Sequence, residues 1–288
     1  MEGTGVPLVT PFAEDGSVDE ANLRELVGWV VDAGVDFVVP CGSNGESELL
    51  TAEERARVTE VVVDASSVPV LAGTGHPGLV ETRRQTDLAA EAGADAALVV
   101  TPFYYSPGQE AFEAYYRRLA DESAIPIYLY SVPAKTGEHL EPETVGALSG
   151  HGNVHGMKDS AGDVVRLIRE RRLAVEDFDL FVGSGSLYAQ GLDVGTAGGI
   201  LALANVVPDL ASEVYRRHRG GDVDGARALN ADLVELNRAV TARYGVPGVK
   251  AAMDYRGVPS GALRSPLLPL GDDARREVEA LVDGALDG

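Results

Sequence analysis

The residue that points most directly to chemistry is Lys158, which follows a short, mostly apolar stretch at 153–157. Lysine is rare in this chain, with only two others in 288 residues, whereas arginine is plentiful. A lysine at the end of a buried strand is partly desolvated, and desolvation disfavours the ammonium form. A neutral amine can attack a ketone to form a Schiff base, which a guanidinium cannot do because it does not deprotonate. We therefore interpret Lys158 as a nucleophile; the alternative is an ion pair with Asp159 or Asp163.

Two other segments carry side chains that could act with this lysine. Residues 41–47, Cys-Gly-Ser-Asn-Gly-Glu-Ser, are small enough to form a nest in which backbone N–H groups around Gly45 and the Ser43 hydroxyl bind a carboxylate. The alternative is a plain glycine turn before a helix, whose start is marked by the Thr-x-x-Glu capping box at 51–54. Tyr130 ends another apolar run and could donate and accept protons, or it could simply pack in the core.

Other patterns that could carry chemistry have plainer explanations. Cys41 lacks the histidine and asparagine context of a nucleophile, so we expect a small buried thiol. The five histidines show no metal-ligand spacing, and we expect no metal site. Residues 73–78 spell Gly-x-Gly-x-x-Gly, but they follow the third apolar run rather than the first, which favours a βα turn over a dinucleotide site. Lys250 falls in a helical region and is expected to be structural.

The charge of the chain narrows the choice of partners. A net charge of -21 and an isoelectric point near 4.5 repel phosphate backbones and anionic lipid, so we expect no nucleic-acid and no membrane binding. Widespread Asp and Glu with almost no lysine favours a halophilic protein, in which counterions screen the self-repulsion; an acidic mesophilic protein is the alternative. There is no basic segment followed by a long apolar run, and no stretch of ~20 apolar residues, so we expect a cytoplasmic protein.

Apolar runs alternate with amphipathic segments along the chain. Eight runs are near-continuously apolar, which is typical of strands covered on both faces, as in a parallel sheet. The runs lie at 5–12, 36–41, 68–73, 95–102, 126–133, 153–160, 178–185 and 198–206, and amphipathic segments between them lie at 19–34, 51–65, 78–92, 109–122 and 163–172. Eight strand–helix units predict an α/β fold of the (β/α)8 TIM barrel type. A doubly wound open sheet is the alternative.

The C-terminal part of the chain has a helical pattern only. Its expected helices lie at 208–219, 222–243, 247–256 and 272–285. We expect residues 1–207 to hold the barrel strands and the catalytic face. Residues 208–288 would form the last barrel helix and a helical appendage that is not an independent domain. Active sites of such barrels lie at the C-terminal ends of the strands, so the geometry predicts that the nest, Tyr130 and Lys158 share one face.

These segments resemble the signatures of the dihydrodipicolinate synthase / N-acetylneuraminate lyase family. The matching residues are Gly42–Glu46, Tyr130–Pro133 and Gly156–Ser160, and the segments GVPLVTPF, TPFYYSPGQE and RSPLLPL agree. The resemblance covers nearly the whole chain. It implies a (β/α)8 barrel with a C-terminal helical part, a homotetramer, and class I aldolase chemistry on pyruvate, a small 2-keto acid. It implies no cofactor, because the covalent imine is itself the electron sink.

The resemblance also implies a role for individual residues. Lys158 matches the lysine that forms the Schiff base, and Tyr130 matches the tyrosine that relays protons to and from the substrate. Ser43 and Asn44 match the pair that binds the pyruvate carboxylate and connects the relay. Tyr104 matches the tyrosine that completes the relay in the synthases from a neighbouring subunit.

Departures from the synthase pattern favour one kind of member. Lys135 stands where synthases usually carry an arginine that holds the second substrate's carboxylate, so a point charge replaces a planar fork. Residues 183–186, Gly-Ser-Gly-Ser, are closer to the Gly-Ser-Asp of 2-keto-3-deoxygluconate aldolases than to the synthases' Gly-Asp-Asp, and Tyr128 also resembles those aldolases. The hydroxyls of Ser184 and Ser186 suit a polyhydroxy substrate.

The favoured function is therefore a lyase of carbohydrate metabolism. This aldolase would cleave a 2-keto-3-deoxy sugar acid, either 2-keto-3-deoxygluconate or its 6-phosphate, to pyruvate and an aldehyde. The first alternative is 4-hydroxy-tetrahydrodipicolinate synthase, which condenses pyruvate with aspartate semialdehyde in lysine biosynthesis. Less favoured are a sugar-acid dehydratase, which uses the same iminium to expel water, and a barrel that binds a keto acid as a regulator without turnover.

Overall fold

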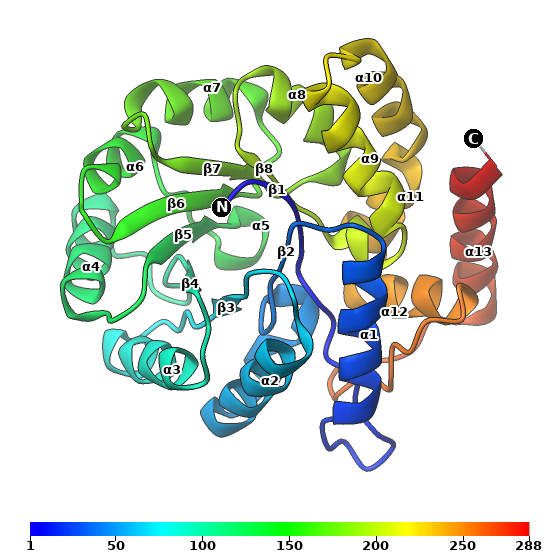
Figure 1. Cartoon of the computed structure of the whole chain (residues 1–288). Coiled ribbons are helices and arrows are strands. Elements are labelled where there is room, and N and C mark those ends of the chain that lie inside the picture. The colour runs from blue at the N-terminus through cyan, green and yellow to red at the C-terminus, as the bar shows by residue number, and fades with distance from the viewer. Residues whose placement is uncertain (288) are drawn as a thin grey trace.

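The computed structural model describes residues 1–287, and its central feature is a barrel of eight parallel strands ringed by helices (Figure 1). The strands are β1 (Gly3–Val6), β2 (Phe37–Val38), β3 (Leu71–Gly73), β4 (Ala96–Val100), β5 (Ile127–Ser131), β6 (Val154–Asp159), β7 (Asp179–Val182) and β8 (Gly198–Ile200). They pair in the order β2-β1-β8-β7-β6-β5-β4-β3, and an isolated parallel bridge between Val38 and Val70 links the two ends of that order. The predicted (β/α)8 barrel is confirmed, and the open-sheet alternative is wrong.

The strands are apolar throughout because both of their faces are covered. All five residues of β5 are buried, and His155 is the one exposed residue of β6. Outward side chains pack under the helices in one large core. Inward side chains, among them Phe37, Tyr128, Tyr130 and Phe181, form a second cluster that fills the barrel. This is the reason that the sequence shows continuous apolar runs rather than an alternating pattern.

Six helices around the barrel begin and end within two residues of the expected segments, and three short ones, at 133–136, 142–149 and 188–193, were not expected. In chain order, these helices are α1 (Glu20–Asp32), α2 (Ala52–Ala65), α3 (Leu79–Glu91), α4 (Gln109–Glu122), α5 (Pro133–Thr136), α6 (Pro142–Ser149), α7 (Val164–Leu173), α8 (Tyr188–Asp193) and α9 (Pro208–Arg219). Local chemistry sets these limits. Thr51 and Glu54 form the predicted capping box at the start of α2. Gly34, with φ +89°, turns the chain in the left-handed conformation just after α1.

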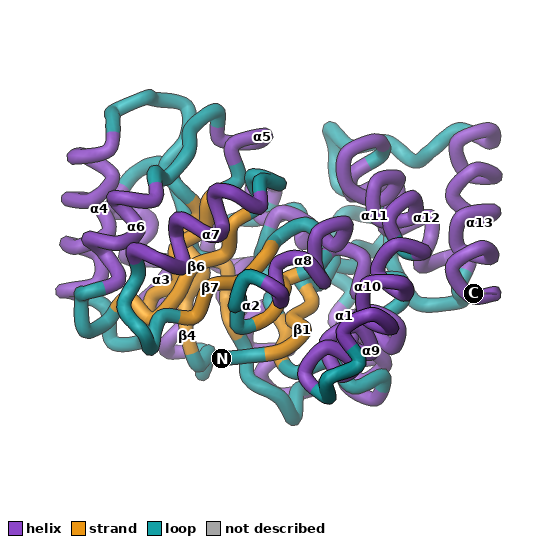
Figure 2. The backbone as a smooth tube through the Cα atoms, turned by 90° about the horizontal axis from the view of Figure 1, so that it is seen from above, coloured by secondary structure: helices purple, strands orange, loops and turns teal. Residues whose placement is uncertain are grey.

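The chain after β8 is helical and packs against one side of the barrel (Figure 2). It continues from α9 into α10 (Val223–Asp232), α11 (Val234–Arg238), α12 (Gly245–Tyr255) and α13 (Asp272–Asp287). The single helix expected over 222–243 is wrong, because α10, α11 and a π-helical turn at Ala239–Arg243 replace it. Within this turn region the Thr241 hydroxyl donates to the Asn237 carbonyl, and such side-chain contacts compete with regular helix bonds. Buried residues of these helices belong to the same core as the barrel's outer face.

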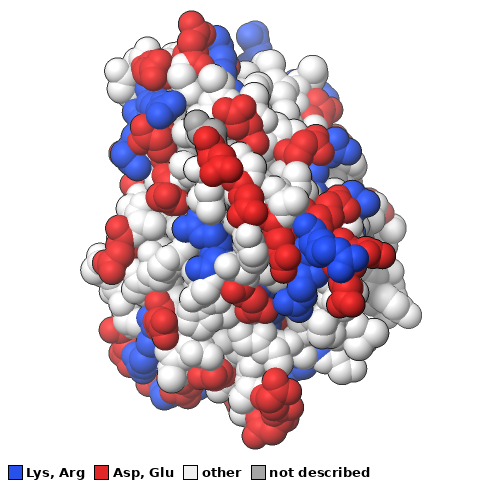
Figure 3. All heavy atoms as spheres, turned by 90° about the vertical axis from the view of Figure 1, so that its right-hand side faces the viewer, with Lys and Arg blue, Asp and Glu red and all other residues white. Residues whose placement is uncertain are grey.

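Charged side chains of both signs are interspersed on the face that carries α13 (Figure 3). Many arginines pair with carboxylates one turn away on the same helix, as Arg117 does with Glu113 and Arg217 with Glu213. No helix within residues 1–287 combines the length and apolar character that crossing a membrane requires.

Candidate active site

A cavity of about 440 Å³ opens at the C-terminal ends of the barrel strands. The loop after β2 lines it with Ser43, the end of β5 lines it with Tyr130, and α5 lines it with Lys135. The C-terminal helical part supplies the facing wall, which the sequence reasoning missed. That wall contains Tyr244, Gly245, Val246, Pro247, Pro266 and Leu267. The cavity therefore combines barrel loops with residues that lie about 200 positions later in the chain.

Lys158 and Tyr130 lie side by side on neighbouring strands. The register of β5 and β6 pairs them directly, and Lys158 Nζ lies 4.5 Å from the centre of the Tyr130 ring. Each side chain is only 6% exposed, and Tyr130 belongs to the cluster that fills the barrel. The predicted convergence of these two residues at the C-terminal face is thus what the barrel produces.

The alternative for Lys158, an ion pair with a nearby carboxylate, does not match the contacts. Asp159 follows it in β6, so its side chain points to the opposite face, where it accepts from Ala161 N at 2.8 Å. Asp163 caps α7 and accepts from Val165 N at 2.8 Å. Within residues 1–287, no carboxylate oxygen lies within 4.0 Å of Lys158 Nζ. A buried amine without a carboxylate partner is suited to act as a nucleophile.

The surroundings of Tyr130 make its phenol unusually acidic. Burial by itself raises the pKa of a tyrosine, but here the positive charge of Lys158 opposes it. Hydrogen bonding from Ser43 and Ser160 and the more distant charge of Lys135 act in the same direction, and the pKa of Tyr130 falls below its ordinary value. A buried tyrosine with a lowered pKa can take a proton from a substrate hydroxyl and return it.

The predicted nest after β2 is a tight turn with strained ends. Cys41 and Glu46 both have positive φ, at +56° and +55°, and Ser43–Gly45 form a short 3-10 helix between them. The first residues of such a helix, Ser43 and Asn44, have backbone N–H groups that no carbonyl of the helix accepts. Both are half-buried at the mouth of the barrel. This arrangement suits the carboxylate of a small keto acid.

A buried ion pair holds this turn from behind. Lys250 on α12 places Nζ 2.7 Å from Glu46 Oε1 and donates to the carbonyls of Thr10 and Ala262 at 2.9 and 2.6 Å. The other Glu46 oxygen accepts from Arg264 N at 2.9 Å. Burial lowers the pKa of Lys250, and the charge of Glu46 opposes that effect. The lysine interpreted as structural thus connects the C-terminal part to the predicted carboxylate site.

Among the residues with predicted roles, Ser43, Tyr130 and Lys135 line this cavity, whereas its lining does not include Lys158, Asn44, Gly45, Tyr104, Tyr128, Ser184 or Ser186. Tyr128 lies two residues before Tyr130, so it is roughly 7 Å farther from the C-terminal end of the strand. Its hydroxyl donates to Asp179 Oδ2 at 2.7 Å, at the start of β7. Tyr104 has a positive φ of +76° and is 86% exposed, with its ring against Tyr105. Its predicted role concerns the site of a neighbouring subunit, so it stays a prediction.

The two serines after β7 are half-buried and do not line the cavity as the structure describes it. Ser186 accepts from Asn237 Nδ2 at 2.8 Å, which ties this turn to α11. Gly183 packs so closely against Ser160 that a Cβ there would lie 1.9 Å from its Oγ. The role of Ser184 and Ser186 in binding a polyhydroxy substrate stays a prediction.

The plainer explanations of Cys41 and of residues 73–78 agree with their surroundings. Cys41 is 2% exposed, and burial raises the pKa of its thiol to about 11, so it stays protonated at neutral pH. Gly73 lies against the Cys41 carbonyl, where a Cβ would come within 2.0 Å. A Cβ on Gly75 would lie 2.5 Å from Val100 N. These glycines allow close packing of the loops after β2, β3 and β4.

Comparison with known proteins places the chain in a family. Residues 1–285 match the model of the dihydrodipicolinate synthetase family. An uncharacterized DapA-like lyase of Halobacterium salinarum is 43% identical over 282 residues, 97% of this chain and 92% of the relative. The 4-hydroxy-tetrahydrodipicolinate synthase of Methanothrix thermoacetophila is 38% identical over 274 residues, 95% and 93% of the two chains.

Solved structures agree with this assignment over the full length. The structure of YagE from E. coli K12, a prophage protein of the dihydrodipicolinic acid synthase family in complex with pyruvate, superposes with a TM-score of 0.95 at 28% identity and 99% coverage of both chains. The family resemblance of the sequence is therefore confirmed. The chain belongs to the dihydrodipicolinate synthetase family, whose members are pyruvate-dependent lyases.

Proposed function

We propose that the protein is a class I aldolase that cleaves a 2-keto-3-deoxy sugar acid to pyruvate and an aldehyde. The observation that carries the proposal is the buried contact between Lys158 and Tyr130, with a lysine that has no carboxylate partner at ion-pair distance within residues 1–287. Ser43 and Asn44 would hold the keto-acid carboxylate, which places C2 near Lys158 Nζ.

The reaction follows from these positions. Lys158 attacks C2, and loss of water gives an iminium that can accept the electron pair of the C3–C4 bond. Tyr130 takes the proton of the C4 hydroxyl as that bond breaks, and the aldehyde leaves. The resulting enamine is protonated at C3, and water then releases pyruvate from Lys158. The iminium supplies the electron sink, so we propose that the reaction needs no metal and no cofactor.

Two features support a sugar acid as the substrate class. The loop after β7 carries the hydroxyls of Ser184 and Ser186, which suit a polyhydroxy chain. Lys135 lines the cavity as a single exposed ammonium, which can pair with a distal phosphate or hydroxyl but does not offer the paired donors of an arginine. Whether the substrate is free or 6-phosphorylated is decided by the experiment below.

A second candidate is 4-hydroxy-tetrahydrodipicolinate synthase. It is favoured by the relative from Methanothrix thermoacetophila, which carries that name and matches 95% of this chain. The two reactions share the pyruvate imine and differ in the aldehyde, which leaves when the C3–C4 bond breaks in the aldolase and is attacked by the enamine carbon C3 in the synthase. The buried contact between Lys158 and Tyr130 serves both reactions equally well.

A substrate panel separates these functions. Purified protein is given 2-keto-3-deoxygluconate, its 6-phosphate, and pyruvate with aspartate semialdehyde, each with the Lys158→Ala variant as a blank. We expect pyruvate release from one of the sugar acids at a kcat/KM at least tenfold above the synthase reaction. A preference for aspartate semialdehyde would overturn the aldolase proposal, and a 2-keto semialdehyde formed without pyruvate would indicate a dehydratase.

We further propose that the protein works as a homotetramer in the cytoplasm, with no nucleic-acid partner. Exposed apolar side chains support self-association, because they gain free energy when buried between subunits. One group is Tyr104 and Tyr105 in the loop after β4, which are 86% and 71% exposed, and another is Val165, Ile168 and Leu173 on α7. Light scattering at several protein concentrations measures the assembly, and a stable monomer would contradict it.

A further inference from the structure

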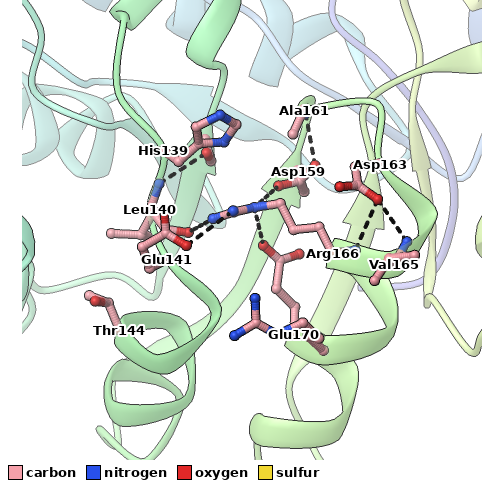
Figure 4. A network of polar contacts seen from close by, with 12 residues as sticks. His139, Leu140, Glu141, Thr144, Asp159, Ala161, Asp163, Val165, Arg166 and Glu170 are labelled. Carbon is pink, nitrogen blue, oxygen red and sulfur yellow. Dashed lines mark hydrogen bonds and ion pairs between the residues drawn. The ribbon is translucent and has the colours of Figure 1, made fainter.

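Behind the strand that carries Lys158 lies a buried cluster of charged groups that the reaction above does not use (Figure 4). Asp159, the next residue of β6, is 1% exposed, and Glu170 on α7 is fully buried. Figure 4 shows the side chain of Arg166 between the two carboxyl groups. Its Nε lies 3.4 Å from Asp159 Oδ2 and 3.2 Å from Glu170 Oε1.

The cluster has more carboxyl groups than its one guanidinium can satisfy. Neither contact of Arg166 Nε has hydrogen-bond geometry, and both Glu170 oxygens and Asp159 Oδ2 are buried without a hydrogen-bond partner among residues 1–287. The rest of the Arg166 guanidinium is directed away from them, toward Glu141 Oε2 at 3.3 Å and the Leu140 carbonyl. Two adjacent buried carboxylates that share one cation repel each other.

One proton resolves this conflict. If Glu170 is protonated, its hydroxyl can donate to the neighbouring Asp159 carboxylate, and Arg166 then faces a single buried negative charge. Burial raises the pKa of both acids, and the neighbouring Asp159 charge raises that of Glu170 further, to about 9. The facing charged groups are Arg166 on α7, Glu141 at the start of α6 and His139 before it.

The cluster is connected to the catalytic face by one short turn. Asp159 Oδ1 accepts from Ala161 N at 2.8 Å, which fixes the chain immediately after β6. Ser160 lies between these two residues, its backbone N–H donates to the Ser131 carbonyl at 2.9 Å, and its side chain helps to lower the pKa of Tyr130. Any shift of Asp159 therefore moves Ser160 relative to Tyr130 and moves the end of β6 that holds Lys158.

We propose that Asp159, Arg166 and Glu170 are positioning residues of the active site, and that the network holds the turn at Ser160 in place only while Glu170 carries a proton. Loss of that proton leaves two carboxylates competing for Arg166 and loosens the turn. This proposal rests on the imine chemistry proposed above, because its readout is the reactivity of Lys158.

The test measures how fast pyruvate forms an imine on Lys158 across a range of pH. The imine is trapped with borohydride, in the wild type and in Glu170→Gln, whose neutral amide mimics the protonated acid. We expect equal rates near neutral pH. At about pH 10 the variant should exceed the wild type by about tenfold, because a pKa of about 9 leaves roughly one Glu170 in eleven protonated. Any pH effect that does not come from Glu170 acts on both proteins and cancels in the ratio.

A matched control uses an exposed ion pair on the same two helices. Glu143 on α6 pairs with Arg169 on α7 at 2.5 Å, and both side chains are exposed. Glu143→Gln should follow the wild type at every pH. Superimposable profiles of Glu170→Gln and the wild type would overturn the proposal, as would a Glu170→Gln protein that is folded and slow at neutral pH.

Infrared spectroscopy tests the proton itself in the wild type and does not depend on whether any variant folds. A protonated buried carboxyl gives a carbonyl stretch that is distinct from that of a carboxylate. We expect this band near neutral pH, its loss above about pH 9, and its absence from Glu170→Gln. If the wild type lacks the band, the proposed positioning role of Asp159, Arg166 and Glu170 is wrong, while the proposed function still stands. If the wild type forms no imine at any pH, the proposed function itself is wrong.

Discussion

At the scale of single residues, the chemistry depends on the contact between Lys158 and Tyr130. The positive charge next to the phenol opposes the effect of burial and lowers the pKa of Tyr130. An iminium carries the same positive charge near the same position, so Tyr130 remains a good proton acceptor after the covalent bond to the substrate forms. In the proposed reaction, one lysine would therefore serve both as the nucleophile and as the group that lowers the pKa of its acid–base partner.

Removal of the phenol hydroxyl should separate these two roles. We expect Tyr130→Phe to form a pyruvate imine on Lys158 while kcat for cleavage falls by about 10²–10⁴-fold, the range typical of a lost general acid–base group. Steady-state kinetics and mass spectrometry of the trapped protein measure the two effects. Tyr255→Phe, in which an exposed tail tyrosine loses its contact with Asp283, is the control and should retain wild-type kcat. A Tyr130→Phe enzyme within threefold of wild type would exclude the proton-relay role.

The sequence could predict which side chains lie close together only where the ends of neighbouring strands place them. Lys158 and Tyr130 end neighbouring parallel strands, so their convergence follows from the barrel. Tyr128 shares the inward face of the barrel with Tyr130, but it lies farther from the C-terminal end of the strand. A family resemblance that rests on residue type does not say how far along the strand a side chain lies. The pairing of Glu46 with Lys250 could not be predicted either, because it joins residues 204 positions apart that no local pattern connects.

At the scale of elements, the turn after β2 depends on α12. Glu46 sits in a left-handed conformation at the end of the turn, and its carboxylate is held by Lys250 and by Arg264 N. Left-handed backbone costs a non-glycine residue free energy, so surrounding contacts must stabilise it. The geometry of the predicted carboxylate site is thereby coupled to the packing of the C-terminal helices.

Breaking this ion pair from one side should be costly. Lys250→Met leaves Glu46 as a buried charge without its ammonium partner, and we expect a loss of about 3–5 kcal/mol in the free energy of unfolding. The double variant Glu46→Gln/Lys250→Met removes both charges and should recover a large part of that loss. Urea unfolding of the wild type, both single variants and the double variant measures the coupling. Additive single effects would contradict an interaction between the two side chains.

The pH dependence of the free energy of unfolding tests whether Glu170, the buried acid of α7, holds a proton in the folded state. The pKa of Glu170 is raised in the folded state, so the folded protein binds a proton that the unfolded chain releases near its ordinary value of 4.5. This contribution to stability is fully present below about 4.5 and is lost as pH rises toward about 9, by at most about 1.4 kcal/mol per pH unit. Thermal unfolding of Glu170→Gln should therefore show a flatter decline over this window than that of the wild type. Parallel declines would contradict the raised pKa.

The elements themselves were largely predictable, and the exceptions arise where a turn or a tertiary contact interrupts the sequence pattern. Helices α1 to α4 and α7 begin and end within two residues of their amphipathic segments, since caps and glycines mark their ends. β2 is shorter than its apolar run because the chain turns at Cys41 with positive φ. The break of the expected helix at 222–243 depends on contacts with the loop after β7, such as Asn230 with Gly185, which the periodicity of one helix does not contain.

At the scale of the whole molecule, the charge distribution is the dominant feature. There are 45 acidic residues against 24 lysines and arginines, so ion pairs cannot neutralise the surface. If the protein is halophilic, as the composition favours, salt screens this self-repulsion and stabilises the folded state. We expect the midpoint temperature of unfolding to rise steadily with the KCl concentration. Sucrose, which does not screen charges, should raise it less. A midpoint that stays constant or falls with KCl would exclude the halophile interpretation.

The cavity is also a property of the whole chain. Its barrel side comes from loops that the sequence predicted, but its other wall comes from the start of α12 and from Pro266 and Leu267. Residues that meet only through tertiary packing leave no spacing signal in one sequence. This wall and Lys135 line the cavity in which the proposed aldehyde would lie. The wall has no signal in the sequence, so the family could be predicted more firmly than the substrate.

The most direct test of the proposed chemistry is the covalent intermediate. Wild-type protein is incubated with pyruvate and borohydride, digested, and studied by mass spectrometry, with Lys158→Ala and Lys135→Ala treated in parallel. We predict one pyruvyl adduct per chain, located at Lys158, present in Lys135→Ala and absent from Lys158→Ala. No adduct in the wild type, or an adduct at another lysine, would contradict the assignment of Lys158 as the nucleophile.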